Sequence, residues 1–135
     1  MKLIKEIKSK EGVVHFKRWR LFKTPWFEVY IHGIYKEDQD EHLHNHPWNI
    51  WTVILRGSYI EEVLSKDGKS SKHNIRTFGV MAYRNADRFH KIKELITKKV
   101  YTLAIVGRRK EREWGYHTDK GFVDHITYRK NKNRI

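Results

Sequence analysis

The chain has no cysteine among its 135 residues, which excludes disulfides and thiolate metal ligands. Any metal site would therefore have to use nitrogen and oxygen donors. No apolar run approaches the roughly 18 residues that a membrane helix needs. The N-terminal segment alternates too strongly with charge to be a secretory signal. We therefore expect a reducing, cytoplasmic location and no membrane partner.

Acidic residues are scarce, with 16 Asp and Glu against 29 Lys and Arg, which gives a formal net charge of +13. Such a balance permits binding to nucleic acid or to small anions. The cations are spread along the chain, and the densest groups are Arg108-Arg109-Lys110 and the tail at 129–135. No helix-turn-helix, zinc-finger or RNA-recognition signature accompanies them. We therefore expect a small anionic molecule as partner, with nucleic acid as the less favoured alternative.

Signals for helix are also few, and only the first ten residues suggest one. Two prolines and eight glycines separate short runs rich in aromatic and β-branched residues. Asp67-Gly68 predicts a hairpin turn, because this dipeptide tolerates positive φ. About ten short strands are typical of an all-β sandwich or barrel, here one domain over 1–135 with its core at about 26–108. The expected strands are 13–21, 26–35, 42–56, 59–64, 74–78, 80–83, 89–95, 100–106, 115–118 and 122–128.

Three histidines alternate with other residues in the segment that runs from His42 to His46. In an extended segment every second side chain points to the same face, so His42, His44 and His46 could converge on one site. Imidazole is the commonest protein metal ligand and suits iron, zinc, copper and nickel. One ion cannot easily take all three, since positions i and i+4 of a strand lie about 13 Å apart. One of the three should therefore lie at the mouth of the site.

A second segment makes the pattern more specific, because Gly79 is followed by five residues, Asn85-Ala86-Asp87, two residues and His90. Together with His44-Asn45-His46 and Gly57, this spacing resembles the two motifs of the cupins. The resemblance implies a jelly roll, a double-stranded β-helix, with His44, His46 and His90 as metal ligands. The His-Pro-Trp run and the later Trp114-Gly115-Tyr116-His117 segment also resemble a group of small bacterial and phage cupins.

The chain departs from the cupin motif at one ligand position. The usual glutamate falls at Ile50 or Trp51, and neither can bind a metal. The remaining three-histidine set resembles that of iron(II)-dependent thiol and diketone-cleaving dioxygenases. Iron(II) is therefore the favoured ion, with zinc, nickel and manganese as alternatives that the sequence does not separate. Three neutral ligands leave the ion its full charge, which favours a small anionic substrate.

Five further residues are candidates around this site. Arg88 could clamp a carboxylate or phosphate, since its fork of donors matches two oxygens. Glu94, four residues after His90, could be a fourth ligand, a proton shuttle or a partner that holds His90 in one tautomer. Tyr30 could act as an acid or base. His42 would contact substrate at the entrance, and Trp48 would wall the pocket.

Two other functions remain open. The chain could be a metal-independent nucleotide-sugar epimerase or ketoisomerase, or a cupin that binds a ligand without catalysis. Whatever the function, we expect a homodimer, because the apolar face of Trp51, Val53 and Leu55 suits burial by a partner, or otherwise by the second sheet.

Overall fold

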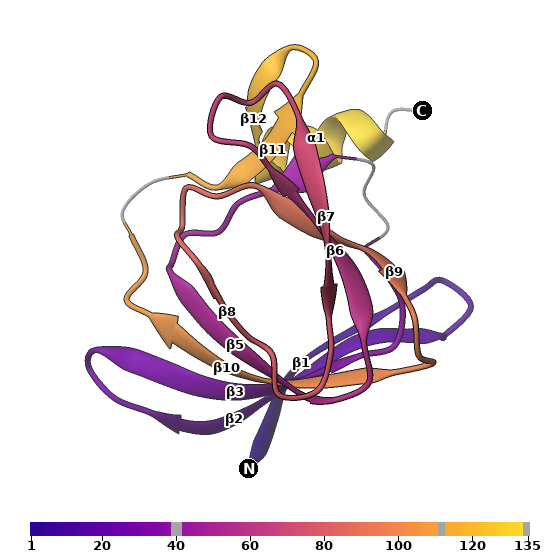
Figure 1. The fold of residues 1–135 in the computed structure, drawn as a ribbon, viewed down its shortest axis with the longest axis vertical. Helices are drawn as coiled ribbons and strands as arrows, with labels where there is room; N and C mark the ends of the chain where they lie inside the picture. The colour runs from indigo at the N-terminus through magenta and orange to yellow at the C-terminus, as the bar shows by residue number, and fades with distance from the viewer. Residues whose placement is uncertain (39–41, 111–112, 134–135) are drawn as a thin grey trace.

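A computed structural model describes residues 1–38, 42–110 and 113–133 of the chain (Figure 1). The described part is almost entirely β, with a single helix near the C-terminus. Its elements are β1 (Lys2–Lys8), β2 (Val14–Lys23), β3 (Phe27–Ile34), β4 (Leu43–His44), β5 (Ile50–Arg56), β6 (Tyr59–Leu64), β7 (Ser71–Arg76), β8 (Met81–Arg84), β9 (His90–Leu95), β10 (Val100–Gly107), β11 (Gly115–Thr118), β12 (Gly121–Asp124) and α1 (His125–Asn133).

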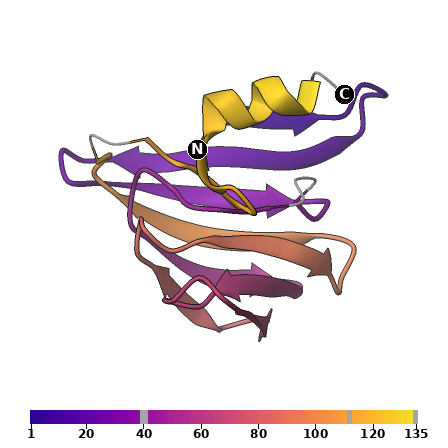
Figure 2. The same ribbon diagram turned by 90° about the horizontal axis from the view of Figure 1, so that it is seen from above.

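These strands form two six-stranded antiparallel sheets. The first sheet has the order β1-β2-β3-β10-β5-β8, and the second has the order β12-β11-β4-β9-β6-β7. Strands that are distant in the sequence pair within each sheet, as β3 does with β10 and β4 with β9. The layered arrangement is clear in Figures 1 and 2, where the two sheets curve around a common interior. The all-β class predicted from the sequence is therefore confirmed.

Alternation along the strands fills the interior between the sheets. On β10, Val100, Thr102, Ala104 and Val106 are buried, while the residues between them are more exposed. This period of two is what a strand with one inward face requires. Two buried clusters result, one around Ile34, Ile54, Tyr59 and Val100, and one around Tyr30, Ala104 and Val106.

Three of the predicted elements differ from the structure. The expected strand 42–56 is two strands, β4 in the second sheet and β5 in the first, with residues 45–49 outside any strand. The first ten residues form strand β1, not a helix, because Lys2–Lys8 pairs antiparallel with β2 and so continues the first sheet by one strand. The predicted strand 122–128 ends at Asp124, where α1 begins. The Asp124 carboxylate accepts hydrogen bonds from the backbone N–H groups of Ile126 and Thr127, both at 3.1 Å, which caps the helix. The basic tail is therefore helical as far as Asn133, and residues 134–135 lie outside the described part.

Two turns contain glycines with positive φ at positions that the sequence analysis named. Gly68 lies in the β6–β7 hairpin with φ of 74°, which confirms the predicted Asp-Gly turn. Gly57 joins β5 to β6 with φ of 86°, and a Cβ there would lie 2.5 Å from the Thr97 hydroxyl. Both the backbone conformation and the space therefore require glycine at position 57.

Candidate metal centre

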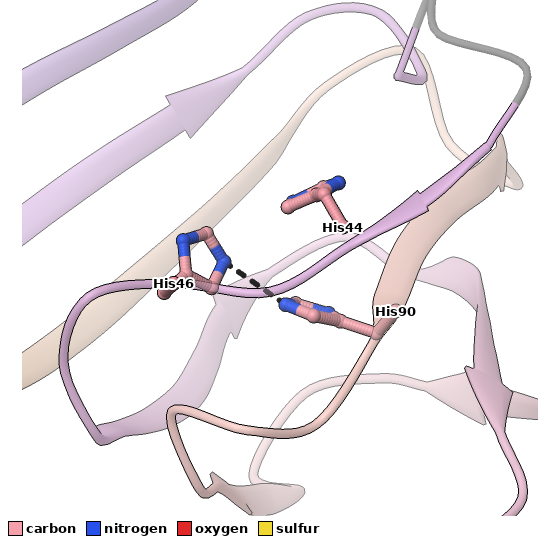
Figure 3. A group of neighbouring side chains, drawn as sticks. All are labelled: His44, His46 and His90. Carbon is pink, nitrogen blue, oxygen red and sulfur yellow. Dashed lines mark hydrogen bonds between the residues drawn. The ribbon is translucent and has the colours of Figure 1, made fainter. Parts of the chain in front are cut away.

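The pairing of β4 with β9 brings the three predicted histidine ligands together. His44 lies directly opposite His90 in the second sheet, so their side chains project from neighbouring strands on one face. His46 follows two residues after His44 and returns to the same side. Figure 3 shows the three imidazoles turned toward one another, with His46 Nε2 3.0 Å from His90 Nε2. One nitrogen of each ring lies within 4.8 Å of the others.

This geometry fits a transition-metal ion. The three ring centroids are 5.0–5.1 Å apart, with interplanar angles between 42° and 89°. Two nitrogens bound at about 2.1 Å, at right angles around one ion, lie about 3.0 Å apart, which is the His46–His90 separation. Nitrogen-only donors of this kind suit iron, zinc or nickel better than calcium or magnesium.

Glu61 holds one of these rings in place. It lies on β6 and is buried at 4% exposure, and its carboxylate oxygen accepts a hydrogen bond at 2.9 Å from Nδ1 of His90. The proton of His90 is therefore fixed on Nδ1, which leaves the Nε2 lone pair facing His46. A carboxylate behind a ligand histidine is a common arrangement in metalloproteins, where it orients the ring and raises its basicity.

The carboxylate of Glu61 is held in turn by two arginines. Arg76 Nη2 lies 3.0 Å from Oε1, and Arg84 contacts both carboxylate oxygens. Burial raises the pKa of Glu61, but the hydrogen bond to His90 and the charge of Arg84 outweigh it and lower the pKa to about 2. Glu61 is therefore ionised at neutral pH. Sequence reasoning missed it, although its alternation with the apolar Tyr59 and Val63 marked it as inward-facing.

The environment keeps His46 neutral. Burial lowers its pKa well below the usual range, and the neighbouring His44, His90 and Arg18 lower it further. The ring stacks on Trp48, with centroids 6.1 Å apart and planes 9° from parallel, and on Trp114 at 6.5 Å. A neutral imidazole is a ready metal donor.

A cavity of about 420 Å³ opens beside this stack. Both Trp48 and Tyr30 line it, and the predicted contact of Trp48 with substrate stays a prediction. Basic side chains stand at its rim, where Arg109 lies 5.9 Å from the Trp48 ring centroid. The other lining residues are Lys23, Thr24, Pro25, Trp26, Phe27, Glu28, Val106, Gly107 and Arg108.

An arginine that sequence analysis did not single out lies close to the histidines. Arg18, on β2, donates from Nε to His32 Nε2 at 3.0 Å, and its guanidinium carbon lies 4.9 Å from the Tyr30 ring centroid and 6.0 Å from that of Trp48. Burial and the charge of Arg18 lower the pKa of His32 to about 3, so His32 is a neutral acceptor. Within the described ranges, the terminal nitrogens of Arg18 make no hydrogen bond.

Tyr30 and His42 lie apart from the three-histidine cluster itself. Tyr30 is 6% exposed, packs against Ala104 and stacks with His32 at 5.8 Å, and its acid–base role stays a prediction. His42 Nδ1 lies 3.0 Å from the Tyr128 hydroxyl of α1, and the ring is not part of the cluster. This placement agrees with a role for His42 away from the ion, and its contact with substrate stays a prediction.

The predicted position of Glu94 does not hold, and the substrate contact of Arg88 stays a prediction. Ile60 pairs with Glu94 but Glu61 pairs with Ile92, so a bulge at Lys93 reverses the alternation of β9. Glu94 is exposed while Leu95 packs on the core, and its expected shared face with His90 is wrong. Arg88 lines two surface cavities that include none of the three histidines, so Arg18 is the nearer guanidinium.

The arrangement of strands is similar to that of known metalloenzymes. A structure of the iron(II) form of HppE superposes with a TM-score of 0.59 at 15% identity, over 76% of this chain and 55% of that one. Hydroxypropylphosphonic acid epoxidase from S. wedmorenis gives 0.58 at 15%, over 76% and 54%. The chain has the jelly-roll fold of the cupins. By these coverages, this chain spans about half the length of the epoxidase chains.

A cupin of more similar size also matches. A proposed mannose-6-phosphate isomerase from Ralstonia eutropha JMP134 superposes with a TM-score of 0.57 at 12% identity, over 68% of this chain and 83% of that one. No family model and no curated protein matches the sequence. At these identities the likeness supports the fold alone. No helix in the described residues has the length and apolar character needed to cross a membrane.

Proposed function

We propose that this chain is a metal-binding cupin in which His44, His46 and His90 hold one divalent ion that acts on a small anionic molecule. Iron(II) with dioxygenase-type chemistry is the first choice, and zinc, nickel or manganese are the alternatives. The observation that carries the proposal is the convergence of three ring nitrogens within 4.8 Å, with the tautomer of His90 set by Glu61. The iron(II) of HppE, a protein of the same fold, is consistent with it.

The protein's part in such chemistry is to bind and orient. An ion held by three neutral imidazoles would supply its full positive charge and open coordination positions to an anionic ligand. Glu61 keeps the lone pair of His90 aimed at the cluster, and the Trp48 and Trp114 rings stack with His46. The two indoles also limit the access of water to that side of the site.

Arg18 is the residue that we assign to the anionic part of the substrate. Its Nε is held by His32 and its plane lies over Tyr30, so the guanidinium is fixed with its terminal nitrogens available. A guanidinium fork matches two oxygens of a carboxylate or phosphate. Tyr30, which stacks on His32 and lines the neighbouring cavity, is the phenol that we assign to proton transfer.

The test is metal binding by the purified chain, measured by elemental analysis and by titration with iron(II), zinc and nickel. We expect close to one ion per chain, and loss of binding when His44, His46 or His90 is changed to alanine. His73→Ala serves as the matched control, since His73 is exposed and lies outside the cluster. Equal binding by the triple alanine variant, or none by the parent, would contradict the proposal.

The identity of the metal then separates the finer alternatives. Iron accompanied by uptake of oxygen with a thiol or carboxylate supports the dioxygenase. Zinc or nickel without oxygen uptake keeps the metal site and removes the oxygen chemistry. Absence of any metal leaves the metal-independent sugar-nucleotide enzyme or the ligand-binding cupin, which assays with nucleotide sugars would distinguish.

A further inference from the structure

The edge strand β7 carries polar and cationic residues on the side that pairs with the inward-facing residues of β6. Lys72, Asn74 and Arg76 lie opposite Val63, Glu61 and Tyr59 of β6, and these three β6 residues all point into the protein. The alternate residue Ile75 faces outward and is 66% exposed. Cations on the inner face and an apolar residue on the outer face disagree with simple burial. The inner face of β7 therefore meets something other than an apolar core.

It meets a cavity of about 290 Å³ where the edges of the two sheets approach each other. Strand β7 is the last strand of the second sheet and β8 is the last strand of the first, and both contribute to the lining. Five of the eight lining residues are cationic and none is acidic. The lining residues are Val63, Ser65, Lys66, Lys72, Asn74, Arg76, Arg84 and Arg88.

The positive charge of this cavity is only partly compensated. Arg76 and Arg84 share the single carboxylate of Glu61, which does not itself line the cavity. Lys66, Lys72 and Arg88 form no ion pair with any acidic group in the part of the chain that the structure describes. The five cationic side chains of the lining are therefore compensated by a single carboxylate. Like charges held this close repel one another unless an anion lies between them.

We propose that this cavity is a binding site for a phosphoryl group, free or as part of a small phosphate ester. Arginine guanidiniums and lysine ammoniums are the side chains that phosphate oxygens prefer, and Asn74 adds an amide donor at the base. The volume lies at the small end of ligand pockets, roughly 300–1,000 Å³, which suits a compact anion better than a large cofactor. This site is separate from the three histidines, none of which lines it.

The experiment is a calorimetric titration of the purified chain with inorganic phosphate and with pyrophosphate at fixed ionic strength. The test variant is Lys66→Gln with Lys72→Gln, which leaves the arginines on Glu61 untouched. The matched control is Lys69→Gln with Lys98→Gln, which removes the same charge from exposed positions, one of them in the same hairpin. We expect saturable binding that the test pair weakens by about tenfold or more and the control pair leaves within a factor of about two.

Absence of saturable binding of either anion would overturn the proposal, whether or not a single-stranded oligonucleotide binds instead. Equal weakening by both pairs would also overturn it. A His44→Ala variant keeps this test apart from that of the metal centre. Phosphate held by a metal would be lost in it, whereas phosphate in the cavity would bind with unchanged affinity. Loss in His44→Ala would therefore also count against the cavity.

Discussion

The carboxylate of Glu61 lies 2.9 Å from Nδ1 of His90, while Nε2 of the same ring lies 3.0 Å from His46. One buried acid thus determines which nitrogen of a candidate ligand is available. The same acid is the anchor for Arg76 and Arg84, so a single carboxylate connects the three histidines to the edge of the barrel.

Changing Glu61 to glutamine should therefore affect both metal affinity and stability. We expect metal affinity to fall by about 10- to 100-fold, because the tautomer and orientation of His90 are no longer fixed. We also expect a loss of about 3 kcal/mol in unfolding free energy, since Arg76 and Arg84 keep their charges without a partner. Metal titration and urea unfolding measure the two effects. Glu62→Gln is the control, because Glu62 points to the opposite face, and equal effects in both variants would contradict the assignment.

Stability of the metal-free chain should rise with pH between about 3 and 6.5. The pKa of His32 is lowered to about 3 by burial and by the charge of Arg18, whereas the unfolded chain binds the same proton near 6.5. Between these values the unfolded state holds more protons, so each pH unit adds about 1.4 kcal/mol for this one group. In urea unfolding from pH 4 to 8, the unfolding free energy of His32→Gln should rise less steeply with pH than that of the parent. An unchanged dependence on pH would contradict the assignment to His32.

Substitutions of Arg18 and Arg88 should differ in their effect on anion binding at the metal centre. With the cobalt-loaded protein, acetate binding can be followed by the visible spectrum. Arg18→Gln should raise the dissociation constant for acetate about tenfold, because a charge-assisted contact is lost. Arg88→Gln should leave it unchanged, since Arg88 lines other cavities. The reverse result would restore the role that the sequence suggested for Arg88.

The outer face of the first sheet should mediate the expected homodimer. Trp51, Met81 and Ile105 are 47%, 64% and 40% exposed and line an apolar groove of about 440 Å³ with Thr52, Val53 and Leu103. Sedimentation velocity should show a dimer that Met81→Glu with Ile105→Glu converts to a monomer. Ile75→Glu, on the other sheet and 66% exposed, should have no effect. A parent protein that sediments as a monomer would contradict the prediction.

Most of the fold was predictable because it depends on local pattern. Alternating residues marked most of the strands, and Asp67-Gly68 fixed a hairpin by its tolerance of positive φ. The N-terminal strand was not predictable, since Lys2–Lys8 has little apolar periodicity and is ordered by pairing with β2. The helix at His125–Asn133 was missed because Phe122 to Tyr128 is as rich in aromatic and β-branched residues as a strand.

The candidate site was predictable only where motif spacing carried the information. His44, His46 and His90 came from two segments whose separation matched the cupin pattern. Glu94 was misplaced because the bulge at Lys93 leaves no clear mark in the sequence. Arg18 and Glu61 were missed because they reach the histidines from β2 and β6, and these contacts arise from pairing between distant strands.

At the centre of the second sheet, the backbone pairing between β4 and β9 is short. Strand β4 has two residues, and within the described residues one register pair, His44 with His90, links it to β9. An ion shared by these two side chains would therefore act as a cross-link between the β12-β11-β4 half and the β9-β6-β7 half. Because such an ion binds only the assembled sheet, it would stabilise the folded state as well as complete the metal site. Chelation should then speed amide hydrogen exchange first in β4 and β11, where the seam opens.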